Sequence, residues 1–360
     1  MEQQTEDVLL SIFAKLTAYD IIRASFTCRS LRAVVTSAAH LISPSSNVSL
    51  LWKVPTERPD CWAYDPSRHA WLFFALGFLT PFEVLYGDLL ASDGGLACLE
   101  AVQVTNESNS VVVQQAVVIF NPILLSKRLI FFPQEMPVLE AVGIKYNGDS
   151  DGYELYALVQ SSETLHAMLR CASSTSAWTF MSSVTVAEGI SVQSRTILIC
   201  NSVSYTVWMK QGVPKLFALH GCEWHEVKLP FMSEFSIHRV FLMDVGGILH
   251  IVRVKYDMED MHIARLRSIY IWRLQTNNRM WVKVIKMGDG LIRAFRKRIT
   301  HAACLDCVGK NGTIYFAVRG HTFWDVLVYE MYTNRWRWME QRECHDNSMV
   351  IFEPSVTAVA

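Results

Sequence analysis

The sequence predicts a mainly β protein, a six-bladed β-propeller preceded by a small unit of three short helices. Two observations carry this prediction. Residues 5–36 place apolar side chains at intervals of three to four, which is the rhythm of amphipathic helices. After residue 48, apolar runs joined by turns rich in Gly, Asn or Asp recur as hairpins. The hairpins repeat every ~45–60 residues, a length typical of propeller blades.

The first helix is indicated by apolar residues at helical spacing, namely Val8, Leu9, Leu10, Ile12, Phe13 and Leu16. Thr17 and Ala18 interrupt the rhythm, and Asp20 stands where a second helix needs its N-cap. A third helix continues through Leu31 and Val34. Because so small a unit buries little surface, its helices cannot hide all of these side chains against one another. Part of the apolar face must therefore meet another surface.

Residues 4–44 resemble an F-box. The stretch EDVLLSIFAKL matches the first helix of that motif, and Asp20, Ile21, Arg23, Cys28 and Arg29 match its second half. The sequence departs from the motif at three places. Gln4-Thr5 replaces the first Leu-Pro, Thr17 replaces the second Pro, and Leu31 replaces the usual Trp.

The resemblance implies a partner for the apolar face. In F-box proteins this face docks on a Skp-type adaptor, which links it to a cullin, and a few apolar anchors supply most of the binding energy. The residues that the resemblance assigns to this contact are Leu9, Leu10, Ile12, Phe13, Leu16, Asp20, Ile21, Ile22, Cys28 and Leu31. An alternative interpretation remains open, in which the same helices pack on the β-domain of their own chain.

Two kinds of hairpin alternate after the polar, Ser-rich linker at 42–47. Hairpins of the first kind have a turn rich in Gly, Asn or Asp, and they are predicted at 89–100, 142–159, 196–210, 239–254 and 301–318. Hairpins of the second kind usually carry a Trp after the turn, and they are predicted at 62–71, 117–132, 169–180, 216–227, 270–284 and 327–339. Each pair of hairpins makes one four-stranded blade, and the bulky Trp is expected to pack between neighbouring blades.

The first Trp hairpin has no partner hairpin before it. VSLLWKV (48–54) and SMVIFEPSVTAV (348–359) are predicted to supply its missing strands, so that the two ends of the chain close the ring and remove an exposed edge. Residues 48–360 resemble the kelch-like β-propeller that follows the F-box in many plant F-box proteins. Six blades are predicted, with five or seven as the alternatives.

Composition argues against several classes of function. The net charge is −1, which favours neither nucleic acid nor an anionic membrane as the main partner. The longest apolar runs are too short to span a bilayer. The nine cysteines are irregularly spaced and no charged-then-apolar leader stands at the start, so the thiols are expected to be reduced and the protein to reside in the cytoplasm, the nucleus or both.

No catalytic or cofactor motif is recognisable. Cys304 and Cys307 form the sole C-x-x-C, and a structural zinc site normally needs a second such pair. No nucleophile stands near a base in any known motif, so neither a catalytic residue, a metal nor a cofactor is expected.

Two segments remain candidates for recognition. The basic run in GLIRAFRKRIT is expected to be a solvated connector, or else a contact for an acidic segment of a partner. The stretch 256–270 is expected to lengthen the loop between two hairpins of one blade, and long loops on a rigid scaffold often carry recognition.

The resemblance implies the function of a substrate-recognition subunit of an SCF-type ubiquitin ligase, in which the front unit holds the adaptor and the propeller holds a target protein. Such a subunit does no chemistry, and the gain in rate comes from proximity between the target and the activated ubiquitin. The alternative is a non-ligase propeller scaffold for protein interactions, whose front helices pack intramolecularly.

Overall fold

The architecture is taken from a computed structural model. It describes residues 8–9, 11–13, 16, 20–21, 24, 27–28, 30–31, 33–34, 49–53, 60–65, 70–74, 76–79, 84–107, 110–122, 124–133, 138–148, 152–230, 237–260, 263–275, 279–298, 305–319, 323–339, 342–343 and 349–353. The expected linker at 42–47 lies outside these ranges, as do Leu10, Ile22 and Cys304.

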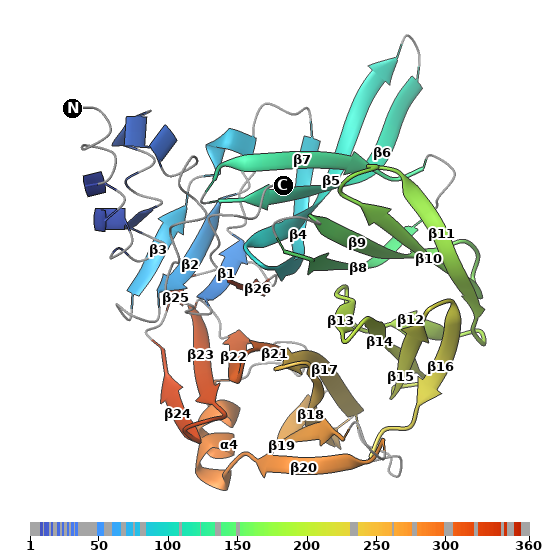
Figure 1. Ribbon diagram of the computed structural model, residues 1–360. Coiled ribbons are helices and arrows are strands. Elements are labelled where there is room, and N and C mark those ends of the chain that lie inside the picture. The colour runs from blue at the N-terminus through green and yellow to red at the C-terminus, as the bar shows by residue number, and fades with distance from the viewer. Residues whose placement is uncertain are drawn as a thin grey trace.

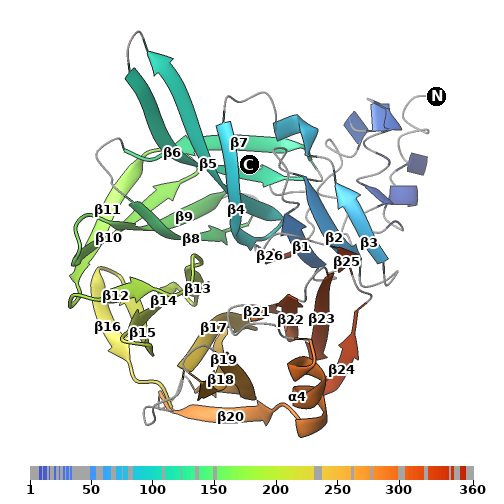
Figure 2. The ribbon, with the colours of Figure 1, turned by 180° about the vertical axis from the view of Figure 1, so that it is seen from behind.

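The strands of the described residues form six blades arranged in a ring (Figures 1 and 2). Blade 1 contains β26 (Met349–Phe352), β1 (Ser49–Lys53), β2 (Cys61–Asp65) and β3 (Ala70–Phe74). Blade 2 contains β4 (Val84–Asp93), β5 (Leu96–Glu107), β6 (Ser110–Asn121) and β7 (Ser126–Phe131). Blade 3 contains β8 (Val138–Tyr146), β9 (Tyr153–Gln160), β10 (Leu165–Ala172) and β11 (Trp178–Thr185). A short 3-10 helix, η2 (Gly77–Leu79), connects the first two blades.

Blade 4 has its innermost strand split in two, so that β12 (Ile190–Val192) and β13 (Leu198–Cys200) both pair with β14 (Val203–Lys210). It is completed by β15 (Val213–His220) and β16 (Glu223–Val227). Blade 5 contains β17 (Ile237–Val245), β18 (Ile248–Asp260), β19 (Ile263–Leu274) and β20 (Trp281–Lys286). Blade 6 contains β21 (Leu305–Lys310), β22 (Thr313–Arg319), β23 (Phe323–Glu330), β24 (Arg335–Trp338) and the short β25 (Arg342–Glu343). A single parallel contact between Asp244 and Lys310 joins blades 5 and 6.

The ring is closed by the two ends of the chain. Strand β26 pairs antiparallel with β1, with Leu50 opposite Ile351 and Leu51 opposite Val350. The apolar residues Met349, Val350 and Ile351 of β26 are buried, as is Leu51. The predicted closure is therefore confirmed, and so is the number of six blades.

The tight hairpins have turns that the sequence specifies locally. Gly246 and Gly247 connect β17 to β18 with φ angles of 61° and 75°. Two successive positive φ angles match the right-handed twist of a two-residue hairpin, and glycine adopts them without strain. Asn201 and Ser202 adopt the same region in the turn between β13 and β14, with φ angles of 50° and 63°.

Tryptophans contribute to the packing between neighbouring blades, as predicted. Trp178 of β11 stacks on Phe132 at 4.7 Å between ring centroids, and its indole N–H donates to the carbonyl of Phe131 in blade 2 over 2.9 Å. Trp281 of β20 donates to the carbonyl of Lys228, next to blade 4, over 2.8 Å. We call the contact surface between two neighbouring blades a seam. A Trp side chain suits a seam because it buries a large apolar area while its indole N–H donates a hydrogen bond.

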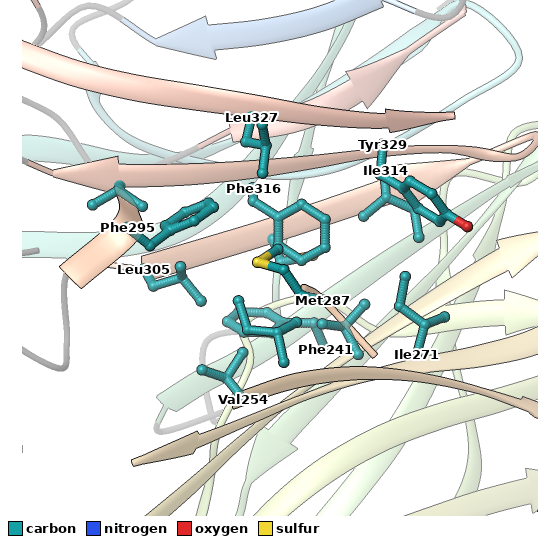
Figure 3. Packing of buried hydrophobic residues seen from close by; sticks show 14 of the residues in the cluster. Phe241, Val254, Ile271, Met287, Phe295, Leu305, Ile314, Phe316, Leu327 and Tyr329 are labelled. Atoms are coloured by element: carbon teal, nitrogen blue, oxygen red, sulfur yellow. The ribbon is translucent and has the colours of Figure 1, made fainter. Parts of the chain in front are cut away.

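Figure 3 shows the largest of these seams, between blades 5 and 6. Phe241 and Ile271 of blade 5 face Phe316 and Leu327 of blade 6, and all four side chains are buried. The cluster also takes in Phe295 from helix α4 (Asp289–Arg296). The blades are held together by apolar burial of this kind, at roughly 25 cal/mol for each Å² removed from water.

Two segments differ from their predicted structure. The basic run is not a connector, because its residues form α4, which buries Ile292 and Phe295 in the seam between blades 5 and 6. The stretch 256–270 is not a long loop, because β18 runs to Asp260 and β19 begins at Ile263. In both cases apolar residues at the spacing of a regular element find a buried surface that only the assembled ring supplies.

The buried His250 of β18 gives the fold a dependence on acid. Its Nδ1 lies 2.9 Å from the carbonyl oxygen of Ile248 and donates to it. Burial lowers the pKa of His250 below 6.5, an effect that Arg273 strengthens and that the Ile248 carbonyl and Asp244 oppose. The folded protein therefore binds this proton less readily than the unfolded chain. The contribution of the neutral His250 to the free energy of unfolding is fully present above pH 6.5. It is lost as the pH falls through the lowered pKa.

We expect the free energy of unfolding to decrease when the pH is lowered from about 7 to about 5, and His250→Gln to make that decrease shallower. Glutamine keeps a donor for the Ile248 carbonyl but cannot take up the proton. Urea unfolding of both proteins at several pH values measures the difference. Parallel pH profiles for the two proteins would show that His250 does not contribute.

Candidate functional site

The front unit lies outside the ring, beside β3 of blade 1 (Figures 1 and 2). Its described residues with helical backbone are Val8, Leu9, Ser11, Ile12, Phe13, Asp20, Ile21, Ala24, Thr27, Ser30, Leu31, Ala33 and Val34. The helical character predicted for this segment is present at these positions. Cys28 has no regular backbone structure, and Leu16 lies in a bend whose N–H donates to the carbonyl of Phe13 over 3.0 Å.

One part of the apolar face is buried. Phe13 is 2% exposed and Ile21 is 0% exposed, and both belong to a cluster that includes Leu51, Leu76 and Leu79 of the β-domain. Partly buried side chains of the front unit pack against the same cluster, namely Leu9, Leu16, Ala24, Leu31 and Val34. The front unit and the first two blades therefore share one apolar core. Phe13 and Ile21 are inaccessible to a second protein in this structure.

Another part of the face is exposed to solvent. Val8 is 59% exposed and Ile12 is 47% exposed, and their spacing of four residues places them together on one side of a helix. Cys28 is also exposed, and Asp20 is half-buried. Val8 was not among the residues assigned to the adaptor contact, although its place in the apolar rhythm was visible. Side chains on opposite flanks of one apolar stripe differ in exposure here because the ring covers only one flank.

A second candidate site is a cavity of about 570 Å³ on the inner side of the ring, lined by residues of the innermost strands β4, β8, β13, β17, β21 and β26. Its charged residues balance in sign, and they are Asp88, Asp93, Asp244, Asp306, Lys145, Arg195, Arg239 and Lys310. A cavity of this size suits a small molecule, although such sites are usually more apolar than this one. None of these residues was predicted from the sequence to form a site, because the lining comes from six separate blades.

Ion pairs made by two cavity residues, Arg195 and Lys310, join segments that are far apart in the sequence. Arg195 makes two parallel bonds to Glu100 in blade 2, at 2.7 and 2.8 Å, and lies 3.4 Å from Asp88. Lys310 pairs with both Asp93 and Glu353. Burial alone lowers the pKa of Lys310, but the two carboxylates more than compensate, so its pKa lies above the ordinary value and the amine stays charged.

The residues between β12 and β13 lie against the inner strand of the neighbouring blade. The N–H of Val142 in β8 donates to the carbonyl of Arg195, and the N–H of Ile197 donates to the carbonyl of Val142, both over 2.8 Å. Gly143 permits this approach, since a Cβ at that position would lie 2.6 Å from the carbonyl oxygen of Ile197. The amide of Gln193 reaches blade 5 and donates to the carbonyl of Val240 over 3.2 Å. Segment 193–197 therefore links blades 3, 4 and 5 from the inside.

We expect the Arg195–Glu100 pair to couple blades 2 and 4 by about 1 kcal/mol, because its bonds are bidentate but half-exposed to solvent. A double-mutant cycle with Arg195→Met and Glu100→Gln, followed by urea unfolding, measures the coupling free energy. Additive effects of the two substitutions would show that the pair does not stabilise the ring.

Three buried cysteines, Cys98, Cys200 and Cys307, are not suited to nucleophilic chemistry. Burial raises the pKa of Cys98 and Cys307 far above the ordinary value, and raises the pKa of Cys200 to about 12. These thiols are protonated at neutral pH, and the thiolate is the reactive form.

Among the described residues, no cluster of three or more His, Cys, Asp or Glu is arranged to hold a metal ion. No helix in the described part of the chain is long and apolar enough to cross a membrane.

Comparison with known proteins identifies the front unit. The model of the F-box domain matches residues 5–41. No curated protein sequence matches the chain. A fucose-specific lectin of Aleuria aurantia, solved as a point mutant in complex with Fucα1-6GlcNAc, superposes with a TM-score of 0.50 at 9% identity, over 84% of this chain and 94% of the lectin.

Two further structures give lower scores. A chain of a nidogen/laminin complex has a TM-score of 0.49 at 10% identity, over 86% of this chain and 100% of its own length. A protein from Lactobacillus plantarum has a TM-score of 0.47 at 8% identity, over 84% of this chain and 98% of its own. At these identities the likeness concerns the fold alone. The chain thus carries an F-box domain at residues 5–41, followed by a β-propeller.

Proposed function

We propose that this protein is the substrate-recognition subunit of an SCF-type ubiquitin ligase. In this proposal residues 4–44 bind a Skp-type adaptor and through it a cullin, and residues 48–360 form a kelch-like propeller that binds a target protein. The observation that carries the proposal is the pair Val8 and Ile12, which are exposed and apolar within the matched F-box domain. Exposed apolar side chains on a helix are suited to docking in the groove of a partner.

The described residues assigned to the adaptor contact divide into three groups by exposure. Ile12 and Cys28 are exposed and lie ready for contact, together with Val8. Leu9, Leu16, Asp20 and Leu31 are half-buried and can contribute their outer atoms, whereas Phe13 and Ile21 hold the unit together from inside. Leu10 and Ile22 remain assigned by resemblance alone.

The proposed role requires no catalysis by this chain. The buried thiols of Cys98 and Cys307 are protonated, and Arg195 and Lys310 of the cavity are held in ion pairs. Ubiquitin transfer belongs to the conjugating enzyme that the complex recruits, and the protein works in the cytoplasm, the nucleus or both. The receptor contributes by holding the target at high effective concentration.

One observation favours the second candidate, a propeller scaffold without a ligase. Phe13 and Ile21 are buried in the same cluster as Leu51, Leu76 and Leu79 of the first blades, so the front unit has an intramolecular packing role as well. The ligase hypothesis requires the exposed side chains of Val8 and Ile12 to bind an adaptor, whereas the scaffold hypothesis does not.

Calorimetry with purified full-length protein and a Skp-type adaptor distinguishes the two candidates. The ligase hypothesis predicts binding in the micromolar range or tighter, about −8 kcal/mol or better. Absence of binding at millimolar adaptor would leave the scaffold hypothesis.

A further inference from the structure

The positive charge of the chain is concentrated in one blade. Residues 237–298, which comprise blade 5 and α4, contain 13 Lys and Arg but 5 Asp and Glu. The whole chain has 33 Lys and Arg and 34 Asp and Glu, so the remainder carries a formal net charge of −9. A local excess of this size creates a field of one sign next to the surface, even though the protein as a whole is nearly neutral.

Four of these basic side chains are exposed along the outer edge of the blade. Lys283 and Lys286 lie on β20, the outermost strand, and Arg293 and Lys297 lie in and directly after α4. We call these four residues the basic rim. Figures 1 and 2 show β20 and α4 one after the other on the outside of the ring.

The basic rim has an ordered arrangement. Lys283 lies opposite Trp272 and Lys286 lies opposite Tyr270 in the register of β19, so the two lysines point to the same face of the sheet. Arg293 and Lys297 are four residues apart, which places them on one side of the helix. β20 is roughly 20 Å long and α4 roughly 12 Å, so an extended segment of about ten residues is long enough to reach both.

Two neighbouring basic residues, Arg296 and Arg298, are held by contacts within the fold. Arg296 donates to the carbonyl of Leu266 over 2.6 Å. Arg298 lies 3.2 Å from Asp325 and covers the ring of Trp338 at 4.0 Å. Within the rim, Lys286 forms an exposed ion pair with Asp289 at 3.7 Å, and the side chain of Asp289 is 77% exposed.

An acidic protein segment fits this surface better than a nucleic acid does. The rim is local, and the rest of the chain is net negative, so a long polyanion that extended beyond the rim would be repelled. A short segment with several Asp or Glu side chains meets the positive charge without that penalty. Such pairing at a rim contributes mainly to the rate of association and to specificity.

We propose that the basic rim of blade 5 and α4 binds an acidic segment of the target protein. The proposal rests on the proposed function, since it names the chemistry by which the propeller recognises its target. It places the contact on the outer edge of the ring, away from the front unit on blade 1.

The test uses a fluorescein-labelled peptide of about ten residues rich in Glu, with fluorescence anisotropy of the full-length protein as the readout. Lys283→Glu with Arg293→Glu is expected to weaken binding about tenfold, as the loss of about 1.4 kcal/mol in rim contacts implies. Lys210→Glu with Arg335→Glu changes the net charge by the same amount on blades 4 and 6, and is expected to change binding less than about twofold. A peptide with Gln in place of Glu should not bind.

Three outcomes would overturn the proposal. They are no binding of the Glu-rich peptide at low salt, an equal loss in both double variants, and tighter binding of a single-stranded oligonucleotide of the same charge that is lost in the rim variant. Adaptor binding by the rim variant, measured in parallel, separates this proposal from the ligase proposal. The rim variant should bind the adaptor as the unaltered protein does, whatever happens to the peptide.

Discussion

Deletion of residues 348–360 is expected to lower the free energy of unfolding of the ring by about 5 kcal/mol, enough to unfold many domains of this size. The deleted segment contains β26, whose Met349, Val350 and Ile351 are buried. Burying three such side chains contributes about 1.5–3 kcal/mol each, and realistic unfolded states reduce that sum somewhat. The deletion also leaves one edge of β1 unpaired, while its other edge still pairs with β2.

Thermal and urea unfolding of the deletion variant measure this effect. Truncation after Glu353 keeps β26 and Glu353, the partner of Lys310, and serves as the control. We expect the control to unfold close to the unaltered protein. If removal of β26 changed stability by less than about 1 kcal/mol, the pairing of β26 with β1 would not be what closes the ring.

Val8→Asp combined with Ile12→Asp is expected to weaken binding of a Skp-type adaptor at least about a hundredfold, because central apolar anchors supply most of the energy of such contacts. Both side chains are exposed, so their replacement leaves the apolar core intact and the urea midpoint nearly unchanged. Calorimetry with the adaptor and urea unfolding of the same variant provide the two measurements.

Leu85→Asp combined with Val113→Asp is the matched control for that experiment. It makes the same kind of change at two exposed apolar positions of blade 2. The control should bind the adaptor normally. If the adaptor bound the Val8/Ile12 variant as tightly as the unaltered protein, the exposed flank would not be the docking surface. Phe13→Asp is unsuitable here, since Phe13 is buried and its replacement would disturb the core of the front unit.

Much of the ring could be predicted because its hairpins are encoded locally. The Gly246-Gly247 turn, flanked by apolar runs, specifies a hairpin without reference to the rest of the chain, and the structure has β17 and β18 at that place. The closure by β26 was predictable for a different reason. The first Trp hairpin lacked partner strands, and an open edge is a liability that folds avoid.

The positions that escaped prediction depend on contacts between blades. Nothing in the sequence around Arg195 indicates that it reaches Glu100 in blade 2, because the two residues come together only when the ring is complete. Helix α4 is a similar case, since its Ile292 and Phe295 need the seam between blades 5 and 6 in order to be buried. A short apolar run in the sequence does not reveal whether the folded protein provides a surface that can bury it.

The front unit combines a feature that the sequence encodes locally with one that depends on contacts between distant parts of the chain. The sequence by itself determined that the front unit carries an apolar stripe at helical spacing, since spacing and residue type are local properties. Its resemblance to an F-box over residues 4–44 agrees with the family model, which matches residues 5–41. Only the tertiary structure decided which flank of that stripe is covered. Phe13 and Ile21 are buried with the first blades, whereas Val8 and Ile12 remain in solvent. The physical reason is that burial depends on which surfaces the closed ring brings against the helices, and that geometry is set by residues as distant as β26.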